Sequence, residues 1–138
     1  MPYFAGMKLK TVFYLLAATA ILTACTGGLS ADKLYGTWNY VKIDHPKGDA
    51  TDTVNNDDLS ANKPHIIFKK NNELEIWWGG KILSHGSFKT EAKNIQFTEQ
   101  LEGGQTRTFP FWVSQLDDKT LVFETLDAEG SRVTAKKQ

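Results

Sequence analysis

The sequence predicts an all-β domain in which eight antiparallel strands close into an up-and-down barrel. After residue 34, short runs of β-branched and aromatic residues recur, and no segment repeats apolar residues at helical spacing over ten or more positions. Short turn-forming segments separate the runs and connect antiparallel neighbours. Such a meander closes into a barrel more simply than it forms a sandwich, because Greek-key crossings need several long links.

Eight strands follow from these runs and turns. Only the link between the first two strands is long, and residues 44–63 in it are polar and acidic, as in a solvated lid. Pro110 lacks a backbone N–H and predicts a bulge or an edge-like spot in the sixth strand. The expected strands are 35–43, 64–70, 73–78, 81–89, 93–99, 105–114, 119–125 and 130–136.

Alternation along these strands predicts which side chains fill the barrel. Polar residues such as Lys69, Gln96 and Glu124 occupy the opposite positions and predict a wetted outer wall. The expected inner face consists of Trp38, Tyr40, Ile66, Phe68, Leu74, Ile76, Trp78, Gly86, Phe88, Ile95, Phe97, Phe109, Phe111, Val113, Leu121 and Phe123.

The N-terminal residues are typical of a secretory signal. Lys8 and Lys10 precede an apolar run over residues 11–22, which is shorter than the ~20 residues that cross a bilayer. Leu22-Thr23-Ala24-Cys25 at its end resembles the lipobox of bacterial lipoproteins, in which the cysteine is acylated and becomes the N-terminus. We therefore expect a signal peptide over residues 1–24, a lipidated tether over 25–33 and a barrel domain over 34–138.

The lipobox resemblance also predicts a location and one partner. Acyl chains on Cys25, palmitate among them, would anchor the protein in a membrane. Thr26 stands where lipoproteins retained in the inner membrane of enteric-type bacteria carry aspartate. The expected location is therefore the outer membrane of a Gram-negative bacterium, with the domain facing the periplasm or the cell surface.

Charge and cysteine content exclude other classes. Of the 16 basic residues, Lys8 and Lys10 leave with the signal peptide, so 14 remain against 16 acidic residues. A slightly acidic chain lacks the basic footprint of a nucleic-acid-binding protein. Cys25 is the single cysteine, which excludes an internal disulfide framework.

Leu34-Tyr35-Gly36-Thr37-Trp38, followed by a long loop and a hairpin meander, resembles bacterial lipocalin-like lipoproteins over roughly residues 34–137. Gly36-Thr37-Trp38 matches the G-x-W of lipocalins, in which the tryptophan plugs the closed end of the barrel. The arginine that stacks on this tryptophan in longer lipocalins has no clear equivalent, because Arg132 falls early in the last strand. Gln115-Leu116-Asp117-Asp118 stands in place of the T-D-Y-type motif. The resemblance implies a short lipocalin-like barrel.

Two functions of different classes fit this barrel. In the first, a small apolar ligand binds at the open end, because Ser84 and Gly86 lack bulk and would dent the wall. In the second, the barrel is filled and the domain is a protein-binding envelope module, an inhibitor or an assembly accessory, which docks through outward-facing Trp77, Leu83 and Trp112. The candidate ligand-binding residues are Trp38, Tyr40, Phe68, Trp78, Ser84, Gly86 and Phe111.

Other chemistry has little support in the sequence. There is no G-x-S-x-G, and the carboxylates are expected in loops rather than in inward pairs, so we expect no enzyme. His45, His65 and His85 lack a metal-ligand spacing, and the acidic loop lacks a calcium-binding pattern, so we expect neither metal nor cofactor. Asp52-Thr53-Val54 resembles an O-glycosylation acceptor of some Gram-negative bacteria, with Thr53 as the modified residue.

Overall fold

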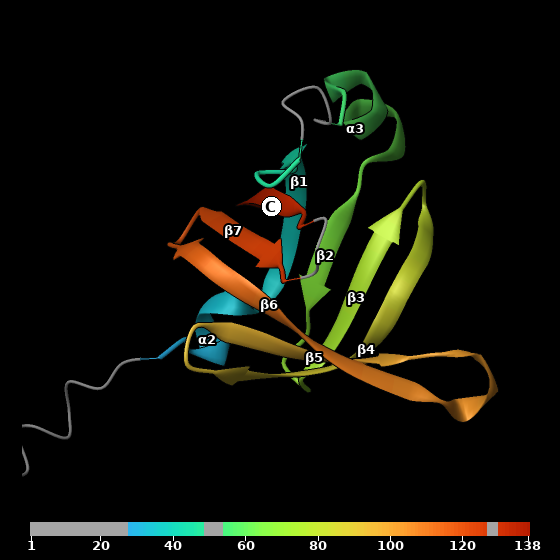
Figure 1. Cartoon of the computed structure of the whole chain (residues 1–138), viewed down its shortest axis with the longest axis vertical. Coiled ribbons are helices and arrows are strands. Elements are labelled where there is room, and N and C mark those ends of the chain that lie inside the picture. The colour runs from blue at the N-terminus through green and yellow to red at the C-terminus, as the bar shows by residue number, and fades with distance from the viewer. Residues whose placement is uncertain (1–27, 49–53, 127–129) are drawn as a thin grey trace, which may run out of the picture.

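The computed structural model describes residues 28–48, 54–126 and 130–138. Each of its eight strands pairs antiparallel with the next, and the last pairs with the first, so the sheet closes into a barrel as predicted (Figure 1). The strands are β1 (Gly36–Asp44), β2 (His65–Phe68), β3 (Glu73–Trp78), β4 (Lys81–Glu91), β5 (Asn94–Gln100), β6 (Thr106–Leu116), β7 (Thr120–Thr125) and β8 (Arg132–Lys137). The described helical elements are α2 (Ala31–Leu34), α3 (Asn56–Asn62) and the 3-10 turn η1 (Glu102–Gly104).

Alternate side chains fill the barrel, which confirms the predicted inner face. On β5, for example, Ile95 and Phe97 are buried, whereas Gln96 between them is half-exposed. The buried apolar residues, from Leu34 to Ala135, form one core, and removing their surface from water is the main stabilising force. A chain of residues 26–138 therefore keeps every described strand and the whole described core.

Trp38 closes one end of the barrel. Its side chain is fully buried, and its indole Nε1–H donates a hydrogen bond to the carbonyl of Leu34, the last residue of α2, at 2.8 Å. The ammonium group of Lys137 lies 5.2 Å from the centre of the indole ring, within range of a cation–π contact. Lys137 at the end of β8 thus places a cation over Trp38, where longer lipocalins have an arginine that has no clear equivalent in this sequence.

Residues 28–33 pack on the barrel, although the sequence suggests a flexible tether there. The Leu29 N–H donates to the carbonyl of Ala92 at the β4–β5 turn at 2.8 Å. Leu29 and Ala31 also pack against the core. The chain therefore enters the fold at the closed end of the barrel. Cys25 lies outside the described residues.

The link between β1 and β2 contains a helix, which its polar and acidic sequence does not predict, although most side chains of this helix are exposed, as expected of a solvated segment. α3 begins after Asn55, whose side chain accepts the Asp57 N–H at 3.0 Å, and Leu59 on its inner side is buried in the core. The Gly79 N–H donates to the carbonyl of Asn62 at 2.8 Å and ties α3 to the β3–β4 turn. Seven residues are too few to display a helical repeat, and the capping asparagine is the main local signal.

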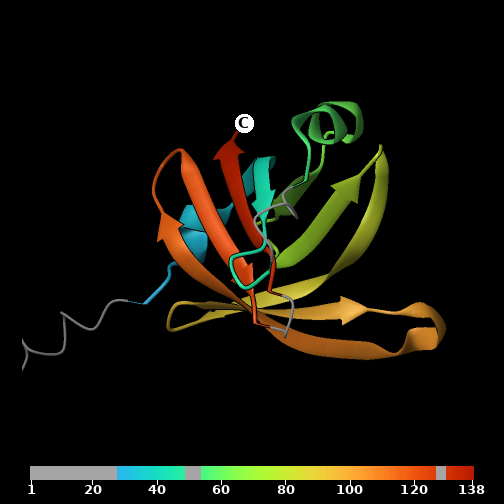
Figure 2. The ribbon, with the colours of Figure 1, turned by 45° about the horizontal axis from the view of Figure 1, so that its top comes forward.

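The hairpin of β5 and β6 extends beyond its neighbours. Pairing of β4 with β5 ends at Gly86 and Glu99, and pairing of β6 with β7 begins only at Phe111. Residues 100–110, the β5–β6 arm, therefore pair only within the β5–β6 hairpin and project from the barrel (Figures 1 and 2).

Pro110 sits at the base of the arm, where β6 separates from β7. The Val113 N–H donates to the carbonyl of Lys93, just before β5, at 2.9 Å. Backbone N–H groups alternate in direction along a strand, and Pro110 is an odd number of residues from Val113. The backbone nitrogen of Pro110 therefore faces away from β5, and its missing hydrogen removes no bond between β5 and β6. The edge-like spot expected at Pro110 is confirmed.

Candidate functional site

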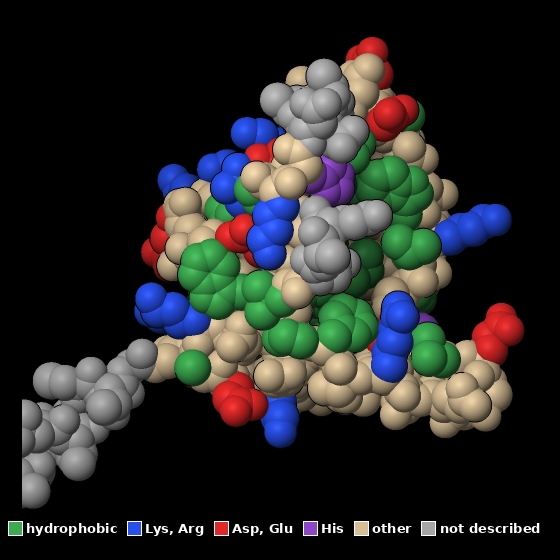
Figure 3. Space-filling model, viewed as in Figure 1, with side chains coloured by type: hydrophobic (Ala, Val, Ile, Leu, Met, Phe, Trp, Pro, Cys, Tyr) green, Lys and Arg blue, Asp and Glu red, His purple; other side chains and the backbone are tan. Residues whose placement is uncertain are grey.

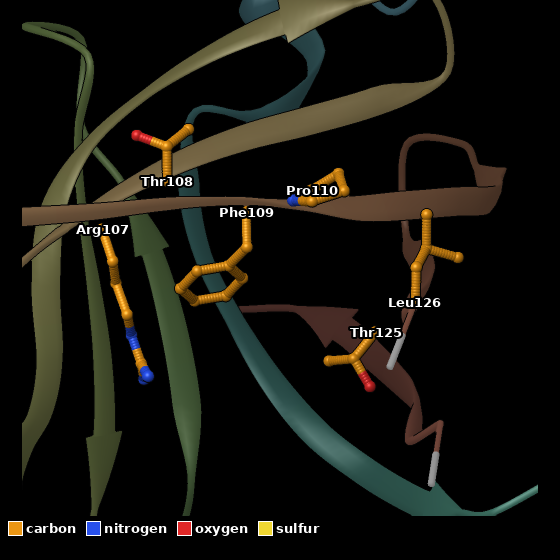
Figure 4. A pocket seen from close by; sticks show the side chains of 6 residues that line it. All are labelled: Arg107, Thr108, Phe109, Pro110, Thr125 and Leu126. Atoms are coloured by element: carbon orange, nitrogen blue, oxygen red, sulfur yellow. The ribbon is translucent and has the colours of Figure 1, made fainter. Parts of the chain in front are cut away.

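A groove of about 500 Å³ lies at the open end of the barrel, at the opposite ends of the strands from Trp38. It occupies the gap between β6 and β7, beyond the last pair, Phe111 and Thr125. Figure 4 shows the lining residues 107–110 on β6, Thr125 at the end of β7 and Leu126 directly after it. The lining residues are Arg107, Thr108, Phe109, Pro110, Thr125 and Leu126.

Phe109 connects the groove to the aromatic part of the core. Its ring centre lies 5.4 Å from that of Phe97 and 5.4 Å from that of Phe111, with the edge of one ring facing the other in both pairs. Phe109 itself is only half-buried, whereas Phe97 and Phe111 are buried. Figure 3 shows hydrophobic side chains gathered on the face above the arm, with basic side chains among them. The groove therefore has an apolar wall that packs on buried aromatic residues.

A buried carboxylate lies beside this wall. Glu99 faces inward on β5 and is only 8% exposed. Its Oε1 accepts the Nε–H of Arg107 at 2.5 Å, and its Oε2 accepts the hydroxyl of Ser84. These three residues, the mouth triad, join β4, β5 and β6 at the point where the arm leaves the barrel. Glu99 is therefore one inward carboxylate outside the loops, and its partners are Arg107 and Ser84 rather than a second carboxylate.

Two residues of the mouth triad continue patterns that the sequence already displays. Glu99 is the next alternate position after Ile95 and Phe97, and Arg107 is the alternate position before Phe109. Extending the inward series by one step on each strand would have placed both side chains at the mouth. Because both residues are charged, the apolar alternation of the two strands does not extend to them.

The predicted ligand-binding residues are spread along the barrel. Trp38 and Phe68 are fully buried at the closed end, and Phe111 is buried in the core. Tyr40 is half-buried, lies edge-on to Phe123 with ring centres 6.1 Å apart, and has a pKa that burial raises. Trp78 is half-buried where β3 ends. Among the predicted residues, only Ser84 belongs to the mouth triad, and the residues that line the groove are different.

Gly86 does not open the wall as expected. A Cβ at this position would lie 1.9 Å from the carbonyl oxygen of Thr98, which is far inside van der Waals contact. The missing side chain therefore allows the backbones of β4 and β5 to approach closely, and it leaves no space for a ligand. β4 pairs with β3 from Lys81 to Ser87 and with β5 from Gly86 to Glu91, so Gly86 lies where it changes partner.

The residues considered for other roles are separated in space. Trp112 and Leu83 face outward, at 38% and 68% exposure, but they lie on β6 and β4 with β5 between them. His65 stacks on Trp77, with ring centres 5.6 Å apart, whereas His45 lies directly after β1, where its Nδ1 is 3.3 Å from the Ser131 hydroxyl. Within residues 28–48, 54–126 and 130–138, no three His, Cys, Asp or Glu side chains cluster as a metal site. Thr53 lies outside the described residues.

A second groove, of about 460 Å³, separates α3 from β1. Its lining combines the polar residues Asn39, Asn56, Ser60 and Lys63 with the apolar Val41, Leu59 and Pro64, and it includes Tyr40 from the predicted ligand-binding set. None of the helices in the described part of the chain is long and apolar enough to cross a membrane.

Comparison with known proteins supports the fold. No family model and no curated protein matches the sequence. Among solved structures, the chain is similar to a lipocalin-like protein from Bacteroides uniformis ATCC 8492, with a TM-score of 0.53 and 14% sequence identity. The match covers 77% of this chain and 99% of that one. The domain is thus a closed eight-stranded barrel of the lipocalin-like type.

Proposed function

We propose that this protein is a non-enzymatic binding protein that holds a small apolar molecule in the groove at the open end of its barrel. The observation that carries the proposal is the groove itself, whose wall of Phe109, Pro110 and Leu126 continues into the aromatic core. Its volume of about 500 Å³ is typical of small-molecule sites. Leu126 is 56% exposed, so a ligand would bury apolar surface that water now covers.

The proposal includes a lipid anchor at Cys25, on the basis of the signal and lipobox in the sequence. Three peptide steps separate Cys25 from Gly28, and they span at most about 11 Å. Because Leu29 is bonded to the β4–β5 turn, such an anchor would hold the closed end near the outer membrane. The mouth would then face away from the bilayer, where it is accessible to a ligand from the aqueous side.

A pair of leucine variants tests the binding site. The chain of residues 26–138 is titrated with the neutral apolar fluorophore N-phenyl-1-naphthylamine, and saturable binding is expected. Leu126→Asp should weaken this binding, because a charge in the groove must be desolvated when the probe binds. Leu83→Asp is the matched control, since Leu83 is also an exposed leucine but lies on β4, away from the groove.

Two outcomes would contradict the proposal. A folded protein that binds no probe would favour the alternative, in which the domain docks onto another envelope protein. Binding that is weakened by Leu83→Asp and not by Leu126→Asp would place the probe on the outer wall.

A further inference from the structure

The Arg107 side chain is held in place from two sides at the rim of the groove. Its Nε–H is bonded to the carboxylate of Glu99 at 2.5 Å, and its guanidinium carbon lies 5.3 Å from the centre of the Phe109 ring. Glu99 is itself fixed, because it is buried and also accepts the hydroxyl of Ser84. A long side chain that would otherwise sample many rotamers is therefore confined before any ligand arrives.

The outer edge of the same guanidinium remains available. A guanidinium has five N–H donors, and the bond to Glu99 uses the Nε–H. Among the described residues, the two terminal nitrogens have no hydrogen-bond acceptor, and the side chain is 64% exposed. Figure 4 shows Arg107 and Phe109 extending from the same side of β6. Two parallel N–H groups of this kind match the two oxygens of a carboxylate.

We propose that Arg107 recognises the carboxylate of an amphipathic ligand, whose apolar part lies against Phe109, Pro110 and Leu126. This inference rests on the proposed function and names the ligand class. Glu99 does not cancel the attraction, because an anion at the outer edge of the guanidinium is nearer to Arg107 than to the carboxylate behind it. The mouth triad is then a positioning device, in which Ser84 and Glu99 orient Arg107 and do not contact the ligand.

Comparing an acid with its alcohol isolates the carboxylate. Decanoate and decanol have the same chain length, and each is used to displace N-phenyl-1-naphthylamine from residues 26–138, at a pH where the acid is ionised. The wild-type chain should bind decanoate more tightly than decanol, by roughly tenfold for a bidentate charged hydrogen bond. The double variant Glu99→Gln with Arg107→Met should lose this preference while retaining decanol binding, and it leaves no unpaired buried carboxylate. Lys47→Met, which removes an exposed cation outside the groove, should keep the preference.

The outcomes separate the two proposals. Equal affinity of the wild-type chain for decanoate and decanol overturns the carboxylate inference and leaves apolar binding intact. A preference that persists in the double variant also overturns it, because another group must then bind the acid. If neither compound displaces the probe and the probe itself does not bind, the proposed function fails and the inference fails with it. Arg107→Lys, which retains a charge for Glu99 but loses the planar fork, should reduce the preference even if the double variant does not fold.

Discussion

Replacement of Trp38 tests how the barrel is closed. The indole is fully buried and bonded to Leu34, and truncating a buried aromatic residue to alanine costs about 3–5 kcal/mol through lost transfer energy and the cavity that remains. Trp38→Phe keeps an aromatic ring in the core but removes the N–H that satisfies the buried carbonyl of Leu34. An unsatisfied buried acceptor costs about 1–3 kcal/mol. We expect the wild type to have the highest free energy of unfolding, Trp38→Phe a lower one and Trp38→Ala the lowest.

Equilibrium unfolding of residues 26–138 in urea measures these losses, followed by far-ultraviolet circular dichroism because the substitutions alter tryptophan emission. Small domains have a free energy of unfolding of about 5–15 kcal/mol, so Trp38→Ala removes a large part of it. Trp38→Phe should remove less, so its loss can be measured even if Trp38→Ala does not fold. Trp112→Ala is the control on the outer wall and should cost less than about 1 kcal/mol. A loss below about 1 kcal/mol for Trp38→Ala would refute the assignment of Trp38 as the plug.

Three further changes test other parts of the fold and its anchoring. Gly86→Ala should destabilise the chain by roughly 1–3 kcal/mol in the same urea assay, because its Cβ would collide with the Thr98 carbonyl; a neutral effect would show that β4 and β5 do not approach so closely. The hydrogen bond from Arg132 lowers the pKa of Asp44 below 3.8, its unperturbed value, so its stabilising contribution is present above that pH and lost as the pH falls through the depressed value. The stability difference between wild type and Asp44→Asn should therefore shrink on acidification, and a difference that grows would contradict the pairing. Cys25→Ala in the full chain should leave unprocessed precursor, and intact mass spectrometry that finds the mature, acylated protein would exclude the anchor.

The strand order could be predicted from the sequence because every strand pairs with its neighbour along the chain. Alternation on β5, for instance, fixes which of Ile95, Gln96 and Phe97 face the core, and short turns determine the partner. Among the described strands, closure of β1 with β8 is the only pairing between strands distant in sequence, and it follows once the seven connections, six of them short, are taken to join antiparallel neighbours. In this fold, local signals therefore carry most of the topology.

The site was harder to predict, for two physical reasons. A missing side chain, as at Gly86, can either create space or allow two backbones to touch. At Gly86 the carbonyl of Thr98 occupies the space, and the sequence of β4 alone does not show this. A charged residue at an inward position, such as Glu99, looks like an outer-wall residue until its partner Arg107 is seen beside it. Both ambiguities concern contacts between strands, which the pattern within one strand does not encode.

The location of the bound molecule is the central claim, and amide chemical-shift mapping tests it most directly. Decanoate is titrated into isotope-labelled residues 26–138, and the amide signals of Phe109, Thr125 and Leu126 are followed together with the Nε–H of Arg107. We expect these signals to shift in a saturable manner, while the indole N–H of Trp38 at the closed end stays unchanged. Shifts confined to Leu83 and Trp112 on the outer wall, or no shifts at saturating ligand, would contradict ligand binding at the mouth of the barrel.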